Sequence, residues 1–279
     1  MFFVPILHYH LHVAREMSHR VAVSSRKPVP LVPVSAEDFA RANRRVVFRW
    51  LVAALLIILS GSWTYQRVRS SLDARKAIRD GERMLKAGRY TESIQAVDRA
   101  LSARSGLVDA YLLRARANGA LYETDAALRD YTTVIQLQPR NAGAFVERAA
   151  IRLRSNDYQG VVADCGEAIR LDPKFAYAYT LRGIAFRARG NLPESLQDFD
   201  RTIELAPQLD SYFQRATTYQ LMGQHSKALA DLDQVISLNP TNPMGYLARA
   251  KSREAIGDTA GARGDRANGD RLEGRGRDR

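Results

Sequence analysis

Five arginine–aspartate pairs recur along the chain at a constant spacing of 16 residues. An arginine beside an aspartate can act in catalysis or form a bidentate ion pair that holds structure. Catalysis would require the carboxylates to converge on one pocket, whereas regular repetition spaces them about a helix diameter apart. The spacing therefore favours a structural ladder of bidentate pairs. The pairs are Arg114 with Asp130, Arg148 with Asp164, Arg182 with Asp198, Arg215 with Asp231, and Arg249 with Asp265.

Other residues that could support catalysis or metal binding are sparse. Three histidines alternate near the N-terminus and would share one face of a strand, but no cysteine or carboxylate lies near enough in sequence to complete a metal site. The repeat region has no phosphate-binding loop, dinucleotide-binding motif, HExxH motif or Cys/His cluster, and its one histidine is His225. We expect no catalytic residue, no metal site and no cofactor. The alternating histidines are His8, His10 and His12.

The elements that position the ladder follow from a repeat of 33 to 34 residues. Each unit has two helical periods separated by a turn, as in "YTLRGIAFRARGNLPESLQDFDRTIEL" (179–205), and a proline then ends the second helix because it removes a backbone donor. Cys165 falls among the second-helix residues and is expected to be a small buried hydrophobe. The stop prolines are Pro139, Pro173, Pro207 and Pro240.

This unit resembles the tetratricopeptide repeat, a helical hairpin of 34 residues. An aromatic residue opens each first helix, and four residues later a small residue allows the two helices to approach. The resemblance implies an all-α fold, a right-handed solenoid of stacked antiparallel helix pairs. The aromatics are Tyr111, Phe145, Tyr179, Tyr212 and Tyr246, and the small residues are Ala115, Ala149, Gly183, Ala216 and Ala250.

The solenoid is expected to cover residues 70–256. Its repeats are predicted at about 74–107, 108–141, 142–175, 176–208 and 209–242, followed by a capping helix at 243–256. The first lacks the stop proline, having Ser105 instead. The stretch 257–279 is rich in Gly and Arg and has Arg266 where an apolar residue should pack, so we expect a disordered tail.

A concave groove on the first helices is the binding surface that the resemblance implies. Its lining is mainly apolar with arginines beside it, which suits an extended peptide or an amphipathic helix of another protein. The Lys and Asn clamp by which co-chaperones of this family hold a C-terminal carboxylate is absent, so acidic chaperone tails are not expected to bind. The predicted lining residues are Ile78, Leu112, Arg116, Val146, Leu153, Thr180, Ile184, Arg187, Phe213, Thr217 and Leu247.

An alternative function follows from the charge. The chain has 42 Lys and Arg against 30 Asp and Glu, a net charge of +12. Such an excess permits binding of nucleic acid or acidic lipid. The basic residues are spread along the chain, which is more typical of a solvated surface, and no specific nucleic acid partner is expected.

A membrane anchor is predicted at residues 46–65, "VVFRWLVAALLIILSGSWTY". Its length matches the roughly 20 residues that span a bilayer, and Trp50, Trp63 and Tyr65 stand at interfacial positions. About 45 residues precede it and the following "SGSW" is a poor cleavage site, so a cleaved signal peptide fits less well. A buried soluble helix also fits less well.

The positive-inside rule gives nearly equal support to both orientations in the membrane, because basic residues flank the span on both sides. We prefer a single-pass protein of the cell membrane whose repeat domain is extracytoplasmic, and a cytoplasmic repeat domain is the alternative. Residues 1–45 form the preceding tail, expected to be largely disordered, with a proline-rich extended linker within it.

Overall fold

The computed structural model describes residues 36–277 of the chain. The expected tail at 1–35, with His8, His10 and His12, and residues 278–279 lie outside this range. Within it every regular element is an α-helix. The chain divides into two compact units, Met1–Thr64 and Tyr65–Arg279.

The first described helix, α2, runs unbroken over Ala36–Lys86. The predicted disorder is therefore wrong for residues 36–45, which are helical, and the predicted span 46–65 lies inside a longer helix. The segment holds no proline and is rich in Ala, Leu and Arg, which are good helix formers. Phe48–Lys86 qualifies by length and hydropathy as a candidate membrane span, and none of its most apolar window is buried.

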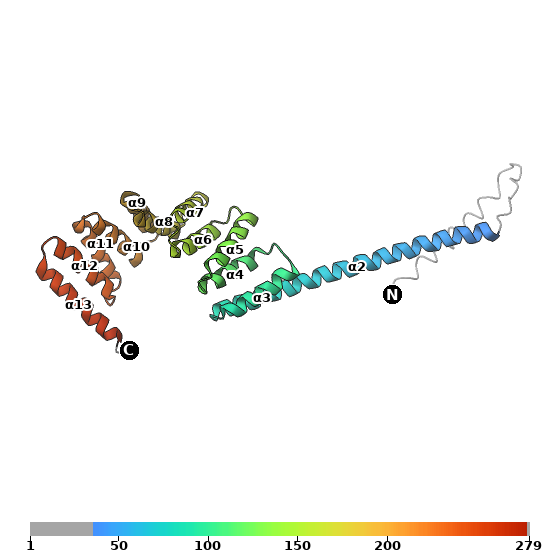
Figure 1. Ribbon diagram of the computed structural model, residues 1–279, viewed down its shortest axis with the longest axis horizontal. Helices are drawn as coiled ribbons and strands as arrows, with labels where there is room; N and C mark the ends of the chain where they lie inside the picture. The colour runs from blue at the N-terminus through green and yellow to red at the C-terminus, as the bar shows by residue number, and fades with distance from the viewer. Residues whose placement is uncertain (1–35, 278–279) are drawn as a thin grey trace, which may run out of the picture. The chain divides into compact units, whose positions relative to one another are not determined.

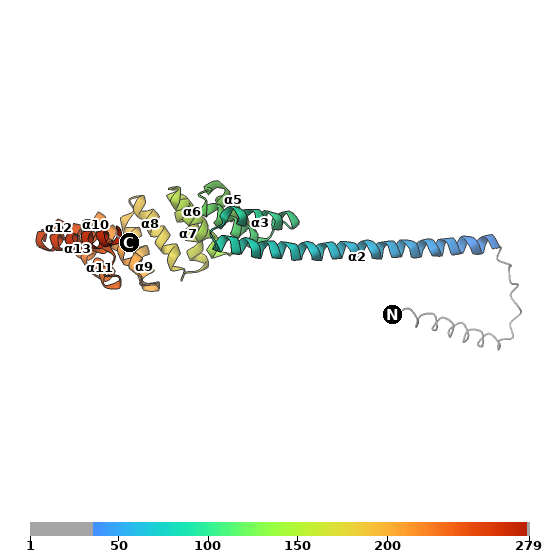
Figure 2. The same cartoon turned by 90° about the horizontal axis from the view of Figure 1, so that it is seen from below.

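Six helical hairpins make up the second unit, and consecutive helices pack against one another from α3 to α13 (Figures 1 and 2). The last turns of α2 pair with α3 to form the first hairpin, since the Ser93 hydroxyl donates to the Gly81 carbonyl at 2.7 Å. Every buried core cluster lies within this unit. The helices are α3 (Tyr90–Ala103), α4 (Val108–Ala120), α5 (Thr124–Leu137), α6 (Ala142–Arg154), α7 (Tyr158–Leu171), α8 (Ala176–Ala188), α9 (Leu192–Leu205), α10 (Leu209–Leu221), α11 (His225–Leu238), α12 (Pro243–Ala255) and α13 (Thr259–Arg277).

Helix ends follow the local sequence. Helices α5, α7, α9 and α11 each end two residues before a stop proline. The turn inside each hairpin contains one residue with positive φ, which is glycine in four hairpins, Asn156 in a fifth, and Tyr122 with φ of 63° in the sixth. A bulky side chain rarely adopts this conformation, so Tyr122 is the exception among these turns.

Close helix crossings explain the small residues of each first helix. Ala115, Ala149, Ala216 and Ala250 have no exposed surface. At the equivalent Gly183, a β-carbon would lie 2.9 Å from the Phe199 ring. Cys165 is buried in the largest core cluster, and burial raises the pKa of its thiol to about 12. The predictions for these small residues and for Cys165 are confirmed.

The predicted disorder of 257–279 is wrong for most of that stretch, because α13 is a helix packed on α12. Asp265 is 2% exposed and Ala262 is likewise buried. Gly269 lies so close to Leu247 that a β-carbon would approach it to 2.6 Å. At Gly269, therefore, a glycine that made the segment look disordered permits close packing of α13 on α12. Arg266 stays exposed and pairs with Glu254.

Candidate functional site

The Arg–Asp ladder forms as predicted. In each pair the arginine Nε donates to one carboxylate oxygen at 2.9 Å and Nη2 donates to the other at 2.7 to 2.8 Å. The aspartate side chains are 3 to 7% exposed. The hydrogen bond that Arg182 donates to Asp198 raises the pKa of Arg182. Each pair joins the two helices of one hairpin, so the ladder is structural.

Most ladder arginines also reach back to the preceding hairpin. Nη1 of Arg114 donates to Asp98 at 2.6 Å, and Nη1 of Arg249 donates to Asp233 at 2.7 Å. At the junction before Arg182 the equivalent position is Gly166, which has no side chain to accept. In the other two arginines Nη1 also donates to the preceding hairpin: from Arg215 to Asp200 at 2.7 Å, and from Arg148 to the Thr132 hydroxyl at 3.0 Å.

Two predicted groove residues are buried and cannot contact a partner. Val146 is 2% exposed within the largest core cluster, and Thr180 is 7% exposed with its hydroxyl 3.4 Å from that of Thr202. The prediction is wrong for both. The residue after the opening aromatic turns toward the second helix at these positions, a direction that depends on how the helices cross.

Other predicted groove residues mainly make contacts within the solenoid. Phe213 packs against the core cluster of Ala216, Ala228 and Leu232. Arg187 donates to the backbone oxygen of Gln214 at 2.9 Å and to its side chain at 2.7 Å, and burial lowers the pKa of Arg187. The rest are half-buried: Ile78 and Leu112 pack on core clusters, Leu247 packs on Gly269, the Thr217 hydroxyl donates to the Phe213 carbonyl at 2.8 Å, and Ile184 shows no specific contact.

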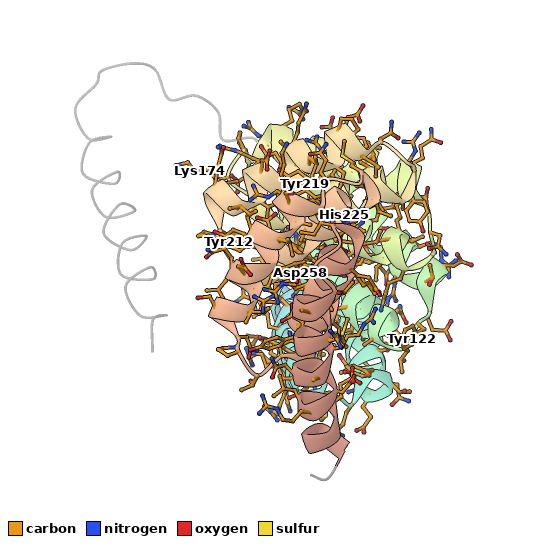
Figure 3. All side chains as sticks on the ribbon, turned by 90° about the vertical axis from the view of Figure 1, so that its left-hand side faces the viewer. Tyr122, Lys174, Tyr212, Tyr219, His225 and Asp258 are labelled. Atoms are coloured by element: carbon orange, nitrogen blue, oxygen red, sulfur yellow. The ribbon has the colours of Figure 1, made fainter. Side chains whose placement is uncertain are left out.

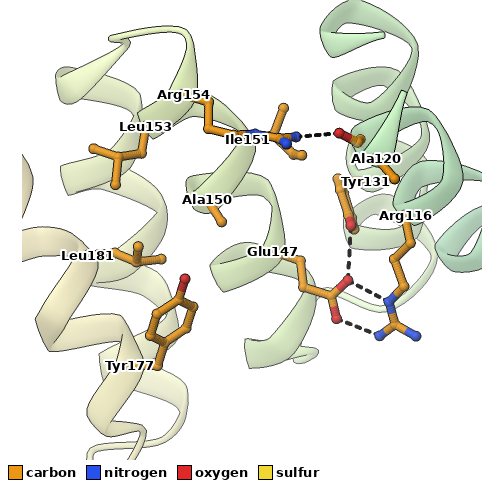
Figure 4. A pocket seen from close by; sticks show the side chains of 11 residues that line it. Arg116, Ala120, Tyr131, Glu147, Ala150, Ile151, Leu153, Arg154, Tyr177 and Leu181 are labelled. Carbon is orange, nitrogen blue, oxygen red and sulfur yellow. Dashed lines mark hydrogen bonds and ion pairs between the residues drawn. The ribbon is translucent and has the colours of Figure 1, made fainter. Parts of the chain in front are cut away.

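The remaining two, Arg116 and Leu153, line an open cleft of about 440 Å³ across α4, α6 and α8. Its polar end is formed where Nε of Arg116 donates to Glu147 at 2.7 Å (Figure 4). The Tyr131 hydroxyl donates to the same carboxylate at 2.9 Å. Burial, followed by the charge of Glu147, raises the pKa of Tyr131, so its hydroxyl stays protonated and keeps donating.

The other end of the cleft is apolar. Leu153 and Ala150 of α6 lie across from Leu181 and Tyr177 of α8 (Figure 4). Tyr177 is 52% exposed although it is a large aromatic residue. The cleft therefore pairs an apolar wall with a polar side, where Arg116 and Glu147 form an ion pair and Arg154 donates to the Gly119 carbonyl at 2.7 Å.

Sequence reasoning missed Tyr177, Leu181, Tyr131 and Glu147. A signal was present for two of them. The five other hairpins have Arg75, Asp109, Gly143, Asp210 and Met244 where Tyr177 stands, so an aromatic there is unusual. Glu147 likewise occupies a position that is Arg, Leu, Leu, Gln and Ala in the other five hairpins.

No group of three or more potential metal ligands occurs among the described residues. His225 begins α11, and the surface around it carries many separate polar side chains (Figure 3). Tyr122, also labelled there, is 78% exposed with the Arg154 guanidinium 5.4 Å from its ring centre.

The sequence profile of the tetratricopeptide repeat matches residues 163–210 and 210–242. The chain carries tetratricopeptide repeats. Together with the hairpins, this establishes an all-helical tetratricopeptide solenoid, the architecture of protein-interaction scaffolds. A solved structure, YrrB, described as a TPR protein with an unusual peptide-binding site, shares this fold with a TM-score of 0.52 at 20% identity, over 60% of this chain and 87% of that chain.

Known relatives share the repeats across a small part of their length. Mouse superkiller complex protein 3 is 28% identical over 57% of this chain and 10% of its own length. Wheat Hsp70-Hsp90 organizing protein is 27% identical over 44% of this chain and 21% of its own length. This chain thus spans about a tenth to a fifth of these relatives.

Proposed function

We propose that this protein is a non-enzymatic scaffold, held in a membrane by the apolar part of α2, that binds a partner protein through its tetratricopeptide repeats. The partner contributes an extended peptide or an amphipathic helix to the cleft across α4, α6 and α8. The proposal rests on one observation above all: Tyr177 is a large, half-exposed aromatic residue facing an apolar wall. Such residues contribute a disproportionate share of binding energy at interfaces.

The form of the cleft supports this class of ligand. Leu153 and Tyr177 offer apolar contact over the buried Leu181, while Arg116, Glu147 and Arg154 offer a polar end. An amphipathic segment matches one apolar and one polar surface at once. YrrB, by its description, has a peptide-binding site, and the wheat relative, by its name, organizes Hsp70 and Hsp90. The carboxylate clamp is missing here, so a different kind of partner segment is expected.

Membrane attachment is proposed for the apolar residues of the predicted span. Trp50, Leu56 and Ile58 are 60 to 72% exposed, and a soluble protein rarely exposes so long an apolar surface. Twenty residues of helix measure about 30 Å, the thickness of a hydrocarbon core. We propose a single-pass protein with an extracytoplasmic repeat domain, and the near-equal basic flanks leave a cytoplasmic domain as the alternative.

The ladder argues against the alternative of a repeat-wide binder of anions. Its five arginines already hold bidentate carboxylate partners, and Arg116 is paired with Glu147. An anion would have to displace these partners. Capture of a partner should therefore change little with salt, whereas binding of a polyanion would fall steeply.

The test is partner capture from detergent-solubilised membranes with the full chain as bait. Tyr177→Ala should reduce capture at least about tenfold with little change in melting temperature, because the side chain is half-exposed. Leu238→Ala is the matched control, since Leu238 is 53% exposed at the end of α11, outside the cleft. Equal capture by wild type and Tyr177→Ala would refute the cleft as the binding site.

A further inference from the structure

The first hairpin differs from the other five on the face of its first helix. Where the others have Ala110, Ala144, Ala178, Ser211 and Gly245, the first has Lys76. Where they have Ala117, Ile151, Ala185, Thr218 and Ser252, it has Arg83.

In the later hairpins the residues at these positions pack against the preceding hairpin. All ten residues are buried. A β-carbon at Gly245 would lie 3.0 Å from Ile236 and from Val235 of α11, which shows how tightly the neighbouring helix approaches. Lys or Arg at such a position cannot be covered in the same way, because burying an unpaired charge is costly. The face that holds Lys76 and Arg83 is thus the free end of the solenoid.

This end, here called the N-terminal basic face, consists of Arg69, Leu72, Lys76, Arg79 and Arg83. The last four follow one another at intervals of 4, 3 and 4 residues, which places them on one side of the helix. Ala74 and Gly81, on the opposite side, are buried. All five residues of the face are exposed. Asp80 lies 3.6 Å from Arg83, whose side chain remains 74% exposed.

Solubility alone does not account for the composition of this face. A terminal repeat needs a polar outer surface, and α13 provides one with Arg266 and Asp270, of opposite sign, where inner hairpins have apolar residues. The N-terminal basic face instead has four cations against Asp73 and Asp80 on the same side, and it includes Leu72, which is 59% exposed, as is Val68 one turn before. Residues 66–86 hold seven Lys and Arg against three acids.

We propose that the N-terminal basic face binds the acidic phospholipid headgroups of the membrane in which the protein is anchored. This inference rests on the proposed anchor, because the face begins four residues after Tyr65, the end of the predicted span. Basic side chains are attracted to the negative surface of such a membrane, and apolar side chains beside them enter the headgroup boundary. The first hairpin would then lie on the membrane surface.

The helix offers a place to bend between the span and this face. Lys76 is 11 residues after Tyr65, about 16 Å along a straight helix, which is beyond close electrostatic reach of a membrane surface. Ser60, Gly61 and Ser62 form a Gly/Ser cluster, and Gly/Ser pairs are common sites of helix kinks. The Thr64 hydroxyl hydrogen-bonds the carbonyls of Ser60 and Gly61, both at 2.9 Å, a contact that often bends helices.

The proposal can be tested with residues 65–279, which contain all six hairpins, every core cluster and the complete ladder. The probe is flotation with vesicles of phosphatidylcholine alone or with about a third phosphatidylglycerol. We expect binding to the acidic vesicles only, and loss of binding at high salt. Because the span is absent, this result is independent of whether the full chain is anchored.

A triple variant and a matched control identify the surface. Lys76→Gln with Arg79→Gln and Arg83→Gln should lower the partition coefficient roughly a hundredfold. The control carries Arg129→Gln, Arg140→Gln and Arg189→Gln, three exposed arginines elsewhere, and loses the same charge. It should bind within about threefold of the unsubstituted fragment, since these residues lie outside the face. Leu72→Ser, which changes no charge, should weaken binding several-fold.

Three outcomes would overturn the proposal. Equal losses in the triple variant and its control would mean that net charge, not this face, governs binding. No binding to acidic vesicles by a fragment whose circular dichroism melt is cooperative would also refute it. Binding to a short DNA duplex that is tighter than binding to vesicles, and lost in the triple variant, would assign the face to nucleic acid instead.

Discussion

At the scale of single residues, the Asp198 carboxylate stabilises the fold and holds the Arg182 guanidinium in place. Asp198 is 5% exposed and accepts two hydrogen bonds from Arg182, whose ring neighbours Tyr179 and Phe186 lie 5.6 and 5.8 Å away. Removing the carboxylate leaves a partly buried guanidinium without its partner, which costs more than the pair itself contributes.

Asp198→Ala should therefore lower the free energy of unfolding by about 1 to 3 kcal/mol, measured by urea denaturation. Glu204→Ala is the control: its pair with Arg201 is exposed, so the expected change is within about 0.5 kcal/mol. An unchanged stability in Asp198→Ala, together with loss of partner capture, would show instead that the carboxylate acts in binding.

At the scale of elements, α13 shows that glycine-rich sequence can form a packed helix when a partner helix requires small residues. Its own composition opposes helix formation, since glycine is unfavourable in helix interiors. What stabilises it is tertiary: Asp265 accepts hydrogen bonds from both Arg249 and Arg253 of α12, and Gly269 lets Leu247 approach.

Deleting 259–279 should destabilise the last hairpin by at least about 3 kcal/mol, because it removes the partner of a largely buried charge. The side chain of Arg249 is only 16% exposed in the intact chain. Thermal melting and amide exchange of α12 would measure the effect, with deletion of 275–279 as the control. Melting equal to that of the intact chain would mean that α13 contributes nothing to the fold in solution.

At the scale of the whole molecule, the proposed function needs two properties at once: a solenoid that presents a cleft and a helix that holds it at a membrane. The two reside in different parts of the chain. The apolar residues of α2 before Tyr65 do not contribute to any core cluster, so changes there should affect attachment without affecting the solenoid.

The full chain should sediment with membranes and resist extraction by alkaline carbonate. Leu56→Arg with Leu59→Arg should release it, since two arginines near the centre of a span cost about 5 to 7 kcal/mol. Circular dichroism melting of the released variant should match that of residues 65–279. Extraction of the unsubstituted chain by carbonate would refute the anchor. The cleft is tested separately, by the capture assay.

The sequence by itself determined the repeat, the first five hairpins and the ladder. These depend on local or periodic signals: prolines two residues past Leu137, Leu171, Leu205 and Leu238, and an Arg–Asp spacing that bridges two helices of one hairpin. Such signals act within about 34 residues, so they can be read without knowing how hairpins stack.

Only the tertiary structure decided which side chains remain accessible. Val146 and Thr180 share the predicted groove register with Leu112 yet are buried, while Tyr177 outside that register is half-exposed. The same holds for α13, whose order comes from ion pairs and close packing with α12. The exposure of a side chain depends on how each helix crosses its neighbours and on the bulk of residues a full repeat away. A local sequence pattern therefore does not predict it.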